Sequence, residues 1–268
     1  FLVAIAALLL WVPLAHAQGN AEPETAAPAE EQQPLPWQPG PLHVDLGHDL
    51  GLDLTERYMF LAKEPAAKVL ESMGNFYSED LLGLATSTDE TADWFVVIRY
   101  QPEGYVKDED SIDAEELLTA LREGNEAANT ERKERGFKPL TLDGWAEPPH
   151  YDSARHQLVW ALIVSDPDGK SVNYNTRVLG RRGYASLNLV TDPAQLQARK
   201  PEAAALLGGT AFGTGARYED FDAGSDKTAE YGLAGLIAAG AGLGAAKLLK
   251  VGLLAKLLGV LVAGKKVI

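Results

Sequence analysis

Four side chains of the types that form hydrolytic sites lie within one heptapeptide, HYDSARH at 150–156. His150, Asp152, Ser153 and His156 supply a hydroxyl nucleophile, two imidazole bases and a carboxylate, as a Ser-His-Asp triad does. The alternating flanks predict a turn between two strands, where four polar residues are also ordinary. Because a triad is defined by geometry rather than by spacing, two interpretations stay open: a hydrolase site near His150–His156, and a polar turn.

A second group of possible ligands lies in HVDLGHDLGLD at 43–53, which contains His43, Asp45, His48 and Asp49. These are donors for a metal, but their spacing matches no known site on a strand or a helix. The chain has no cysteine, which excludes disulfides, thiol catalysis and cysteine-ligated metals. It also lacks the motifs of serine hydrolases, zinc peptidases, P-loop proteins and dinucleotide-binding proteins. The sequence therefore predicts neither a catalytic residue nor a metal or cofactor.

The third candidate depends on strand register. The runs at 156–165, 170–180 and 183–190 alternate with the turns DPDG and GRRG, which predicts an antiparallel meander. If Arg181 and Arg182 form a two-residue loop, Leu179 lies opposite Tyr184, Arg177 opposite Ser186 and Asn175 opposite Asn188. One face of this meander is apolar. The other face is mixed, and its candidate binding residues are Trp160, Asn173, Asn175, Arg177, Ser186 and Asn188.

An aromatic ring beside amides and a guanidinium is suited to a sugar, a peptide backbone or an anionic group. The alternative is that a helix covers this mixed face and that its polar groups bond to the backbone. The helix predicted at 113–136 or the closing helix at 193–209 would supply that cover.

The remaining patterns complete an α+β domain, an antiparallel meander packed with two or three helices. They predict strands at 53–61, 81–86 and 93–101 and a helix at 64–74. Pro201 could split the closing helix in two. The fold class also includes a C-terminal transmembrane helix.

Both ends of the chain predict export and attachment to a membrane. Residues 1–17 are apolar and end in Ala15-His16-Ala17, the pattern of a signal-peptide cleavage site. Residues 18–41 are rich in Pro and Glu and predict a disordered spacer. The α+β domain is then expected over 42–225 and a membrane anchor over 226–268.

The tail is basic, whereas the body is acidic. Residues 18–232 carry 19 basic and 38 acidic side chains, whereas 233–268 contain five lysines and no acid. So acidic a body repels phosphate backbones, which argues against nucleic-acid binding. The window Tyr231–Leu249 is the best candidate span, with Lys247 and Lys250 at its cytoplasmic end. We therefore expect residues 231–268 to contact inner-membrane lipid.

Two blocks of the sequence, KSVNYNTRVLGRRGY at 170–184 and GARYEDFDAGSDKTAEYGLAGL at 215–236, precede a lysine-studded apolar end. These two blocks resemble the bacterial family of uncharacterised membrane-anchored proteins called domain of unknown function 2167. The resemblance covers most of the chain from about residue 50 onward, and the two blocks are its specific part. The resemblance implies an envelope location and a membrane anchor, and it brings no catalytic residues with it.

The sequence thus predicts a protein of the bacterial inner membrane with its main domain in the periplasm. A non-enzymatic binding or assembly module with an envelope protein partner is the leading hypothesis. The alternatives are the envelope hydrolase near His150–His156 and a structural protein that oligomerises through small tail residues such as Gly240 and Gly244.

Overall fold

A computed structural model describes residues 34–240 apart from 74, 76–77, 110 and 135. In the described residues the strands are β1 (Gln38–Pro39), β2 (Leu42–Asp45), β3 (Leu50–Leu54), β4 (Tyr58–Ala62), β5 (Leu81–Ser87), β6 (Phe95–Gln101), β7 (Thr141–Asp152), β8 (Gln157–Asp166), β9 (Gly169–Leu179), β10 (Tyr184–Thr191) and β11 (Thr210–Phe212). The helices are α1 (Lys63–Ser72), α2 (Ala114–Glu134), α3 (Leu196–Gly208), α4 (Leu233–Gly240) and the short 3-10 helix Tyr218–Asp220.

The main sheet has eight antiparallel strands in the order β1-β4-β5-β6-β10-β9-β8-β7. Strands β7 to β10 follow one another in sequence and in space, which confirms the antiparallel meander. The register between β9 and β10 is the predicted one, with Arg177 opposite Ser186 and Asn175 opposite Asn188. The described fold is therefore α+β with one large antiparallel sheet.

The prediction of a single strand at 53–61 is wrong. The chain turns at Thr55, whose carbonyl accepts a hydrogen bond from the Tyr58 amide, and the segment is divided between β3 and β4. Strand β3 joins a second, three-stranded sheet in the order β11-β3-β2, whereas β4 joins the main sheet. Alternation of apolar residues continues on both sides of the turn, so the pattern alone does not reveal the break.

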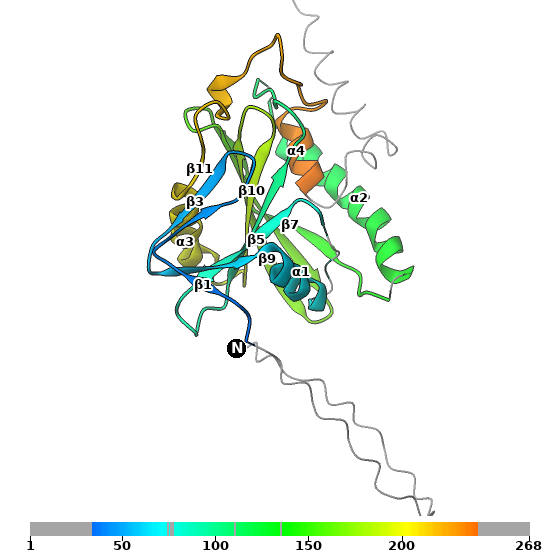
Figure 1. Cartoon of the computed structure of the whole chain (residues 1–268). Coiled ribbons are helices and arrows are strands. Elements are labelled where there is room, and N and C mark those ends of the chain that lie inside the picture. Colours follow the sequence, from blue (N-terminus) through cyan, green and yellow to red (C-terminus); the bar gives the residue numbers. More distant parts are fainter. Residues whose placement is uncertain (1–33, 74, 76–77, 110, 135, 241–268) are drawn as a thin grey trace, which may run out of the picture.

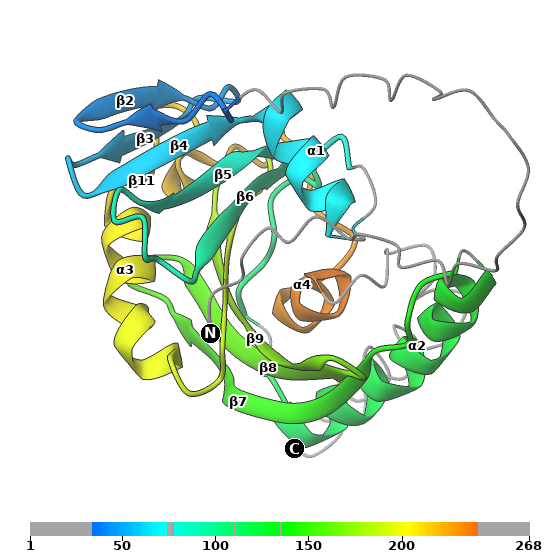
Figure 2. The same ribbon diagram turned by 90° about the horizontal axis from the view of Figure 1, so that it is seen from below.

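The main sheet is strongly curved, and Figure 2 shows it wrapped around α4. Helix α1 lies over β4 and β5 and α2 lies against β7, whereas α3 and the small sheet lie on the outer face (Figures 1 and 2). Inside the curve, Leu121 of α2 and Leu236 of α4 belong to one core with Trp160 of β8. On the outer face, Leu206 of α3 packs in a core with Leu187 of β10. Each face of the sheet is thus covered by helices.

Helix α3 is not split at Pro201. It continues to Gly208, and Pro201 itself is exposed. A proline removes one helical hydrogen bond, but on an exposed side water can solvate the carbonyl that loses its partner.

The predicted transmembrane helix begins inside the described part of the chain. Tyr231, Leu233, Leu236 and Ile237 are buried in the core with α2 and β8, so the first residues of the expected span pack within the domain. No helix of the described residues combines the length and the apolar character needed to cross a membrane. The rest of the expected anchor, 241–268, lies outside the described residues.

The expected signal peptide at 1–17 and most of the expected spacer also lie outside the described residues. The last part of that spacer has a regular structure, because β1 pairs with β4.

Candidate functional site

The six candidate residues of the mixed face come together on the inner side of the curved sheet. The strand pairing places Trp160 opposite Asn175, and Asn175 opposite Asn188. Trp160 is 0 % exposed and Arg177 is 4 % exposed, Asn175 and Ser186 are also buried, and Asn173 and Asn188 are half-buried. Helices α2 and α4 pack against this face, where Trp160 shares a core with them. The sequence had suggested the helix at 113–136, which is α2, or the closing helix, which is α3 and lies on the other face.

Arg177 is the most unusual of these residues. Its guanidinium lies over the rings of Trp160, 4.7 Å from the centroid, and of Tyr184, at 5.9 Å. Its Nη1 donates a hydrogen bond of 3.2 Å to the Thr176 carbonyl. Burial lowers the pKa of Arg177 to about 10, an effect that Tyr184 opposes and the nearby Arg99 reinforces. A cation is thus held in the interior of the domain on aromatic faces.

The asparagines of the mixed face bond to each other and to the backbone. The Asn175 amide donates to the Asn173 carbonyl at 3.0 Å, and the Asn188 amide donates to Asn173 Oδ1 at 3.0 Å. The bond of Asn175 goes to the backbone, as the covered-face alternative expected, whereas that of Asn188 joins two side chains.

The residues of HYDSARH are divided between two environments. His150 Nδ1 lies 3.5 Å from Glu147 Oε1, whereas His156 Nδ1 lies 3.2 Å from the Tyr151 hydroxyl and 3.6 Å from Asp108 Oδ2. Ser153 is an exposed turn residue. His156 thus bonds to Tyr151 and lies at ion-pair distance from Asp108, whereas no contact among these described residues joins it to Ser153.

The donors at 43–53 are separated as well. His43 Nδ1 lies 2.6 Å from Asp53 Oδ1, whereas the His48 ring stacks on Tyr100 at a centroid distance of 4.1 Å. Within the described ranges, no three His, Asp or Glu side chains are grouped as a metal site would need.

Sequence reasoning missed a group of aromatic residues at one end of the sheet. We call this region the turn end: residues 102–108, 153–156, 180–183 and 213–230, near the top of Figure 1. Four rings stack in the order Phe221, Tyr105, Tyr218, His156, with centroid distances of 3.9, 4.4 and 4.1 Å. Tyr218 is buried, and the other three rings are half-buried. This ring stack reaches from the core to the surface.

Hydrogen bonds fix the ring stack along its edge. The Tyr218 hydroxyl donates to the Val106 carbonyl at 2.9 Å, and the Tyr151 hydroxyl donates to Asp108 at 2.7 Å. Burial raises the pKa of Tyr218 well above the usual phenol value. Burial and the hydrogen bond to Asp108 do the same for Tyr151. Both phenols are therefore neutral and serve as hydrogen-bond donors at physiological pH.

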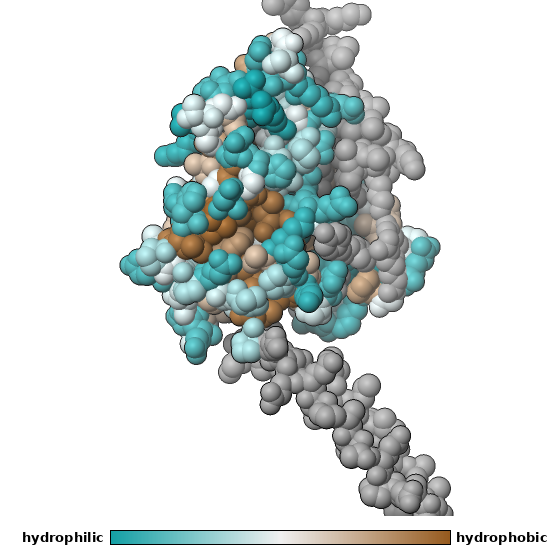
Figure 3. Space-filling view, in the orientation of Figure 1, coloured by the Kyte–Doolittle hydropathy of each residue, from teal (hydrophilic) through white to brown (hydrophobic). Residues whose placement is uncertain are grey.

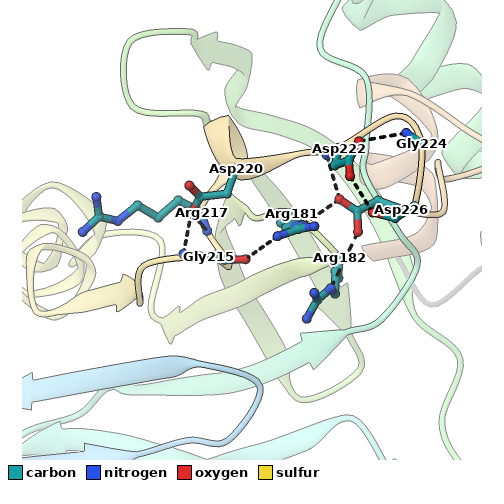
Figure 4. Close-up of polar contacts among 9 residues, drawn as sticks. Arg181, Arg182, Gly215, Arg217, Asp220, Asp222, Gly224 and Asp226 are labelled. Atoms are coloured by element: carbon teal, nitrogen blue, oxygen red, sulfur yellow. Dashed lines mark hydrogen bonds and ion pairs between the residues drawn. The ribbon is translucent and has the colours of Figure 1, made fainter.

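An ion-pair cluster next to the ring stack joins the two sequence blocks (Figure 4). Arg181 Nε lies 2.6 Å from Asp226 Oδ2 and Arg182 Nε lies 3.8 Å from Asp226 Oδ1. Arg181 also donates to the Gly215 carbonyl at 3.1 Å. Because the Asp226 side chain is only 5 % exposed, the attraction is less screened than at an open surface. The cluster fixes the 213–230 segment onto the β9–β10 turn.

The glycine after the two arginines has a steric role. A Cβ on Gly183 would lie 2.1 Å from the Gln101 carbonyl oxygen, which is shorter than any real contact. Gly183 therefore allows β10 to approach the end of β6, where the Gly104 amide donates to the Arg182 carbonyl.

The sequence contained a partial signal for this end. Both blocks that carry the family resemblance lie here, and Arg181, Arg182, Tyr218, Phe221 and Asp226 belong to them. The remaining partners, such as Tyr105 and Asp108, come from a loop far away in the sequence. Their meeting is a tertiary contact that neither spacing nor periodicity reveals.

These features define a class of protein: an α+β domain on a curved antiparallel sheet, with an aromatic and ion-paired turn end and a covered inner face. Within that class, the chain belongs to the family described as protein of unknown function, DUF2167, whose model matches residues 38–268. This match confirms the predicted family.

Two further comparisons add no function. No match was found among curated proteins. A solution structure of cyanobacterial PsbP (CyanoP) from Synechocystis sp. PCC 6803 is similar over 70 % of this chain and 99 % of that chain, with 10 % identity and a TM-score of 0.38. At that score the likeness carries no argument about the fold or the function.

Proposed function

We propose that this protein is a non-enzymatic binding or assembly module of the bacterial envelope, and that its turn end contacts a protein partner. The observation that carries the proposal is the ring stack. Half-buried aromatic rings with fixed orientations supply contact area at little cost in side-chain entropy, as residues at protein interfaces do.

The residues around the ring stack also support a contact with a protein partner. Glu219, Asp222 and Glu230 are exposed beside it, and Asp108 lies at its edge. The ion-pair cluster keeps the backbone of the 213–230 segment in one place, so a partner would meet a preformed surface. An apolar or aromatic partner segment flanked by basic residues would complement these rings and carboxylates.

A photo-crosslinking residue placed at Glu219 in living cells tests this proposal. We expect one discrete covalent adduct, and the same residue at Lys68, on the exposed side of α1, serves as the control. Phe221→Ala, which removes a half-buried outer ring, should reduce the Glu219 adduct without unfolding the domain. Equal labelling at both positions, or none at Glu219 in the folded protein, would reject the turn end as a docking surface.

The second part of the proposal is attachment to the periplasmic side of the inner membrane through residues after the domain. Its support is the sequence of 245–259, which is apolar and carries Lys247, Lys250 and Lys256. Since Tyr231 and Leu236 are core residues, lipid contact would begin after Gly240 rather than at Tyr231.

Alkaline carbonate extraction tests the attachment. The full chain should remain in the membrane pellet, whereas a chain that ends at Gly240 should keep its fold and move to the supernatant. Release of the full chain under these conditions would contradict a membrane anchor, and retention of the shortened chain would place the anchor elsewhere.

A further inference from the structure

Two guanidiniums lie in one row across the inner face of the main sheet. Ser186 of β10 is paired on one side with Arg99 of β6 and on the other with Arg177 of β9. Directly opposed residues of neighbouring antiparallel strands point to the same face, so both arginines extend over Ser186. Arg177 is buried, and only a quarter of the Arg99 side chain is exposed.

Of the two arginines in this row, Arg99 has a carboxylate partner, Asp80. Asp80 Oδ1 lies 3.8 Å from Arg99 Nε, and the two Asp80 oxygens also accept hydrogen bonds from Ser78 and Gln101. Among the described residues, no carboxylate lies within ion-pair distance of Arg177. The row therefore holds one more positive than negative charge in a place where an isolated charge is costly.

Two buried donors at this place also lack partners. In the described part of the chain, Arg177 Nε and Nε1 of Trp160, whose ring lies against the guanidinium, make no hydrogen bond. Buried polar groups in proteins are nearly always bonded, so such a group of unpaired atoms indicates that another species completes it. The Trp160 ring lies against the guanidinium of Arg177, and the unpaired Nε belongs to the edge of the guanidinium that forms a fork with oxyanions.

We propose that this strip, consisting of Arg99, Arg177, Ser186, Asn173 and Asn188, binds a small oxyanion, either a carboxylate or a phosphate group. Arg177 supplies the fork and Trp160 Nε1 a second donor, while Arg99 adds positive charge. Asn173 and Asn188 are half-buried and connect the strip to solvent. Because Arg177 is buried and Trp160 lies in one core with α2 and α4, the ligand is a small molecule rather than a polymer.

Thermal unfolding of the full chain in a non-ionic detergent tests the site. The protein is titrated with sodium phosphate and, separately, with sodium acetate, while sodium chloride keeps the ionic strength constant. An anion that binds only the folded state raises the melting temperature along a saturating curve. We expect saturation with one of the two anions, and which one responds distinguishes phosphate from carboxylate chemistry.

Variants separate a site from a general salt effect. Arg177→Lys keeps the charge but loses the fork, and it should weaken the apparent affinity at least tenfold. Arg177→Met should abolish the saturating response. Arg155→Met removes the same charge from an exposed turn residue and should respond as the wild type does. Phosphate also stabilises proteins through exclusion from their surface, but that effect does not saturate at low concentration and would be equal in all variants.

Two results would overturn the proposal. The first is the absence of a saturating response of the wild-type protein to either anion, which needs no variant to fold. The second is an unchanged response in Arg177→Lys.

Discussion

At the scale of single residues, the mixed face shows how one pattern can serve either binding or structure. Trp160 has the aromatic face that a sugar site would use, but it is 0 % exposed and packs with Leu121 and Leu236. Its ring also supports the guanidinium of Arg177. Trp160 therefore contributes to the stability of the core, and its buried ring nitrogen is the one polar atom that it offers there.

Trp160→Ala should lower the free energy of unfolding by about 3–5 kcal/mol, because it leaves a large cavity in the core. Trp160→Phe keeps an aromatic ring over Arg177 and should cost less. Urea unfolding followed by circular dichroism measures both. A loss below about 1 kcal/mol in Trp160→Ala would show that this core is not packed around the ring.

Gly183→Ala should destabilise the domain by roughly 1–3 kcal/mol, since its Cβ would meet the Gln101 carbonyl and force the turn away from β6. Gly208→Ala is the matched control, because the added Cβ at the end of α3 would meet no atom within 4 Å apart from its chain neighbours and the backbone of its own helix. The melting temperatures of the two variants should therefore differ clearly. Similar values would contradict the close approach at the turn end.

At the scale of elements, single polar contacts hold helices to the sheet at defined points. Helix α3 is joined to β4 through Glu202, which accepts hydrogen bonds from the Tyr58 hydroxyl at 2.7 Å and from Arg57 at 3.0 Å. Burial, together with Glu202, raises the pKa of Tyr58 to about 12, although Arg57 opposes the shift. The contact between these elements thus depends on a protonated phenol.

The raised pKa of Tyr58 predicts a loss of stability at alkaline pH. The phenol ionises near pH 10 in the unfolded chain and near 12 in the folded one, so Tyr58 contributes its full stability below pH 10. That contribution is lost as the pH rises from about 10 to about 12. Urea midpoints measured across this range should fall, and they should fall less steeply in Tyr58→Phe. Parallel curves for the two proteins would exclude Tyr58 as a source of the pH dependence.

At the scale of the whole molecule, the folded domain extends further toward the C-terminus than hydropathy indicates. The curved sheet wraps around α4, whose apolar residues resemble the start of a membrane span in the sequence (Figure 2). In the view of Figure 3, hydrophilic residues surround a central group of apolar ones. In the described part of the chain, Leu35 and Met73 are the large apolar side chains that are clearly exposed.

A chain that ends at Gly240 should unfold cooperatively, whereas one that ends at Glu230 should not. The shorter chain loses Leu233, Leu236 and Ile237, and each fully buried side chain of this kind contributes about 1.5–3 kcal/mol. Domains are stable by only about 5–15 kcal/mol in total, so most of the margin would be removed. Urea unfolding of both chains measures the difference. Equal stability would show that α4 is not part of the core.

The sequence alone predicted much of the sheet. Alternation and turn chemistry were sufficient for the meander and for the pairing of Arg177 with Ser186, because hairpin register follows from local turn length and the two-residue period. The helices α1 and α2 were predicted from capping, glycine and proline signals. The family was predicted from the resemblance of the two blocks around 170–184 and 215–236, and the family model that matches residues 38–268 confirms it.

Only the tertiary structure decided which face was covered and by what. Helix α4 has the composition of a lipid-facing helix, and hydropathy cannot distinguish lipid from the interior of a curved sheet, because both remove apolar side chains from water. The ring stack joins Tyr105 to Phe221, and the ion-pair cluster joins Arg181 to Asp226, across long stretches of chain. Such contacts depend on how the elements pack in three dimensions, which local periodicity does not encode.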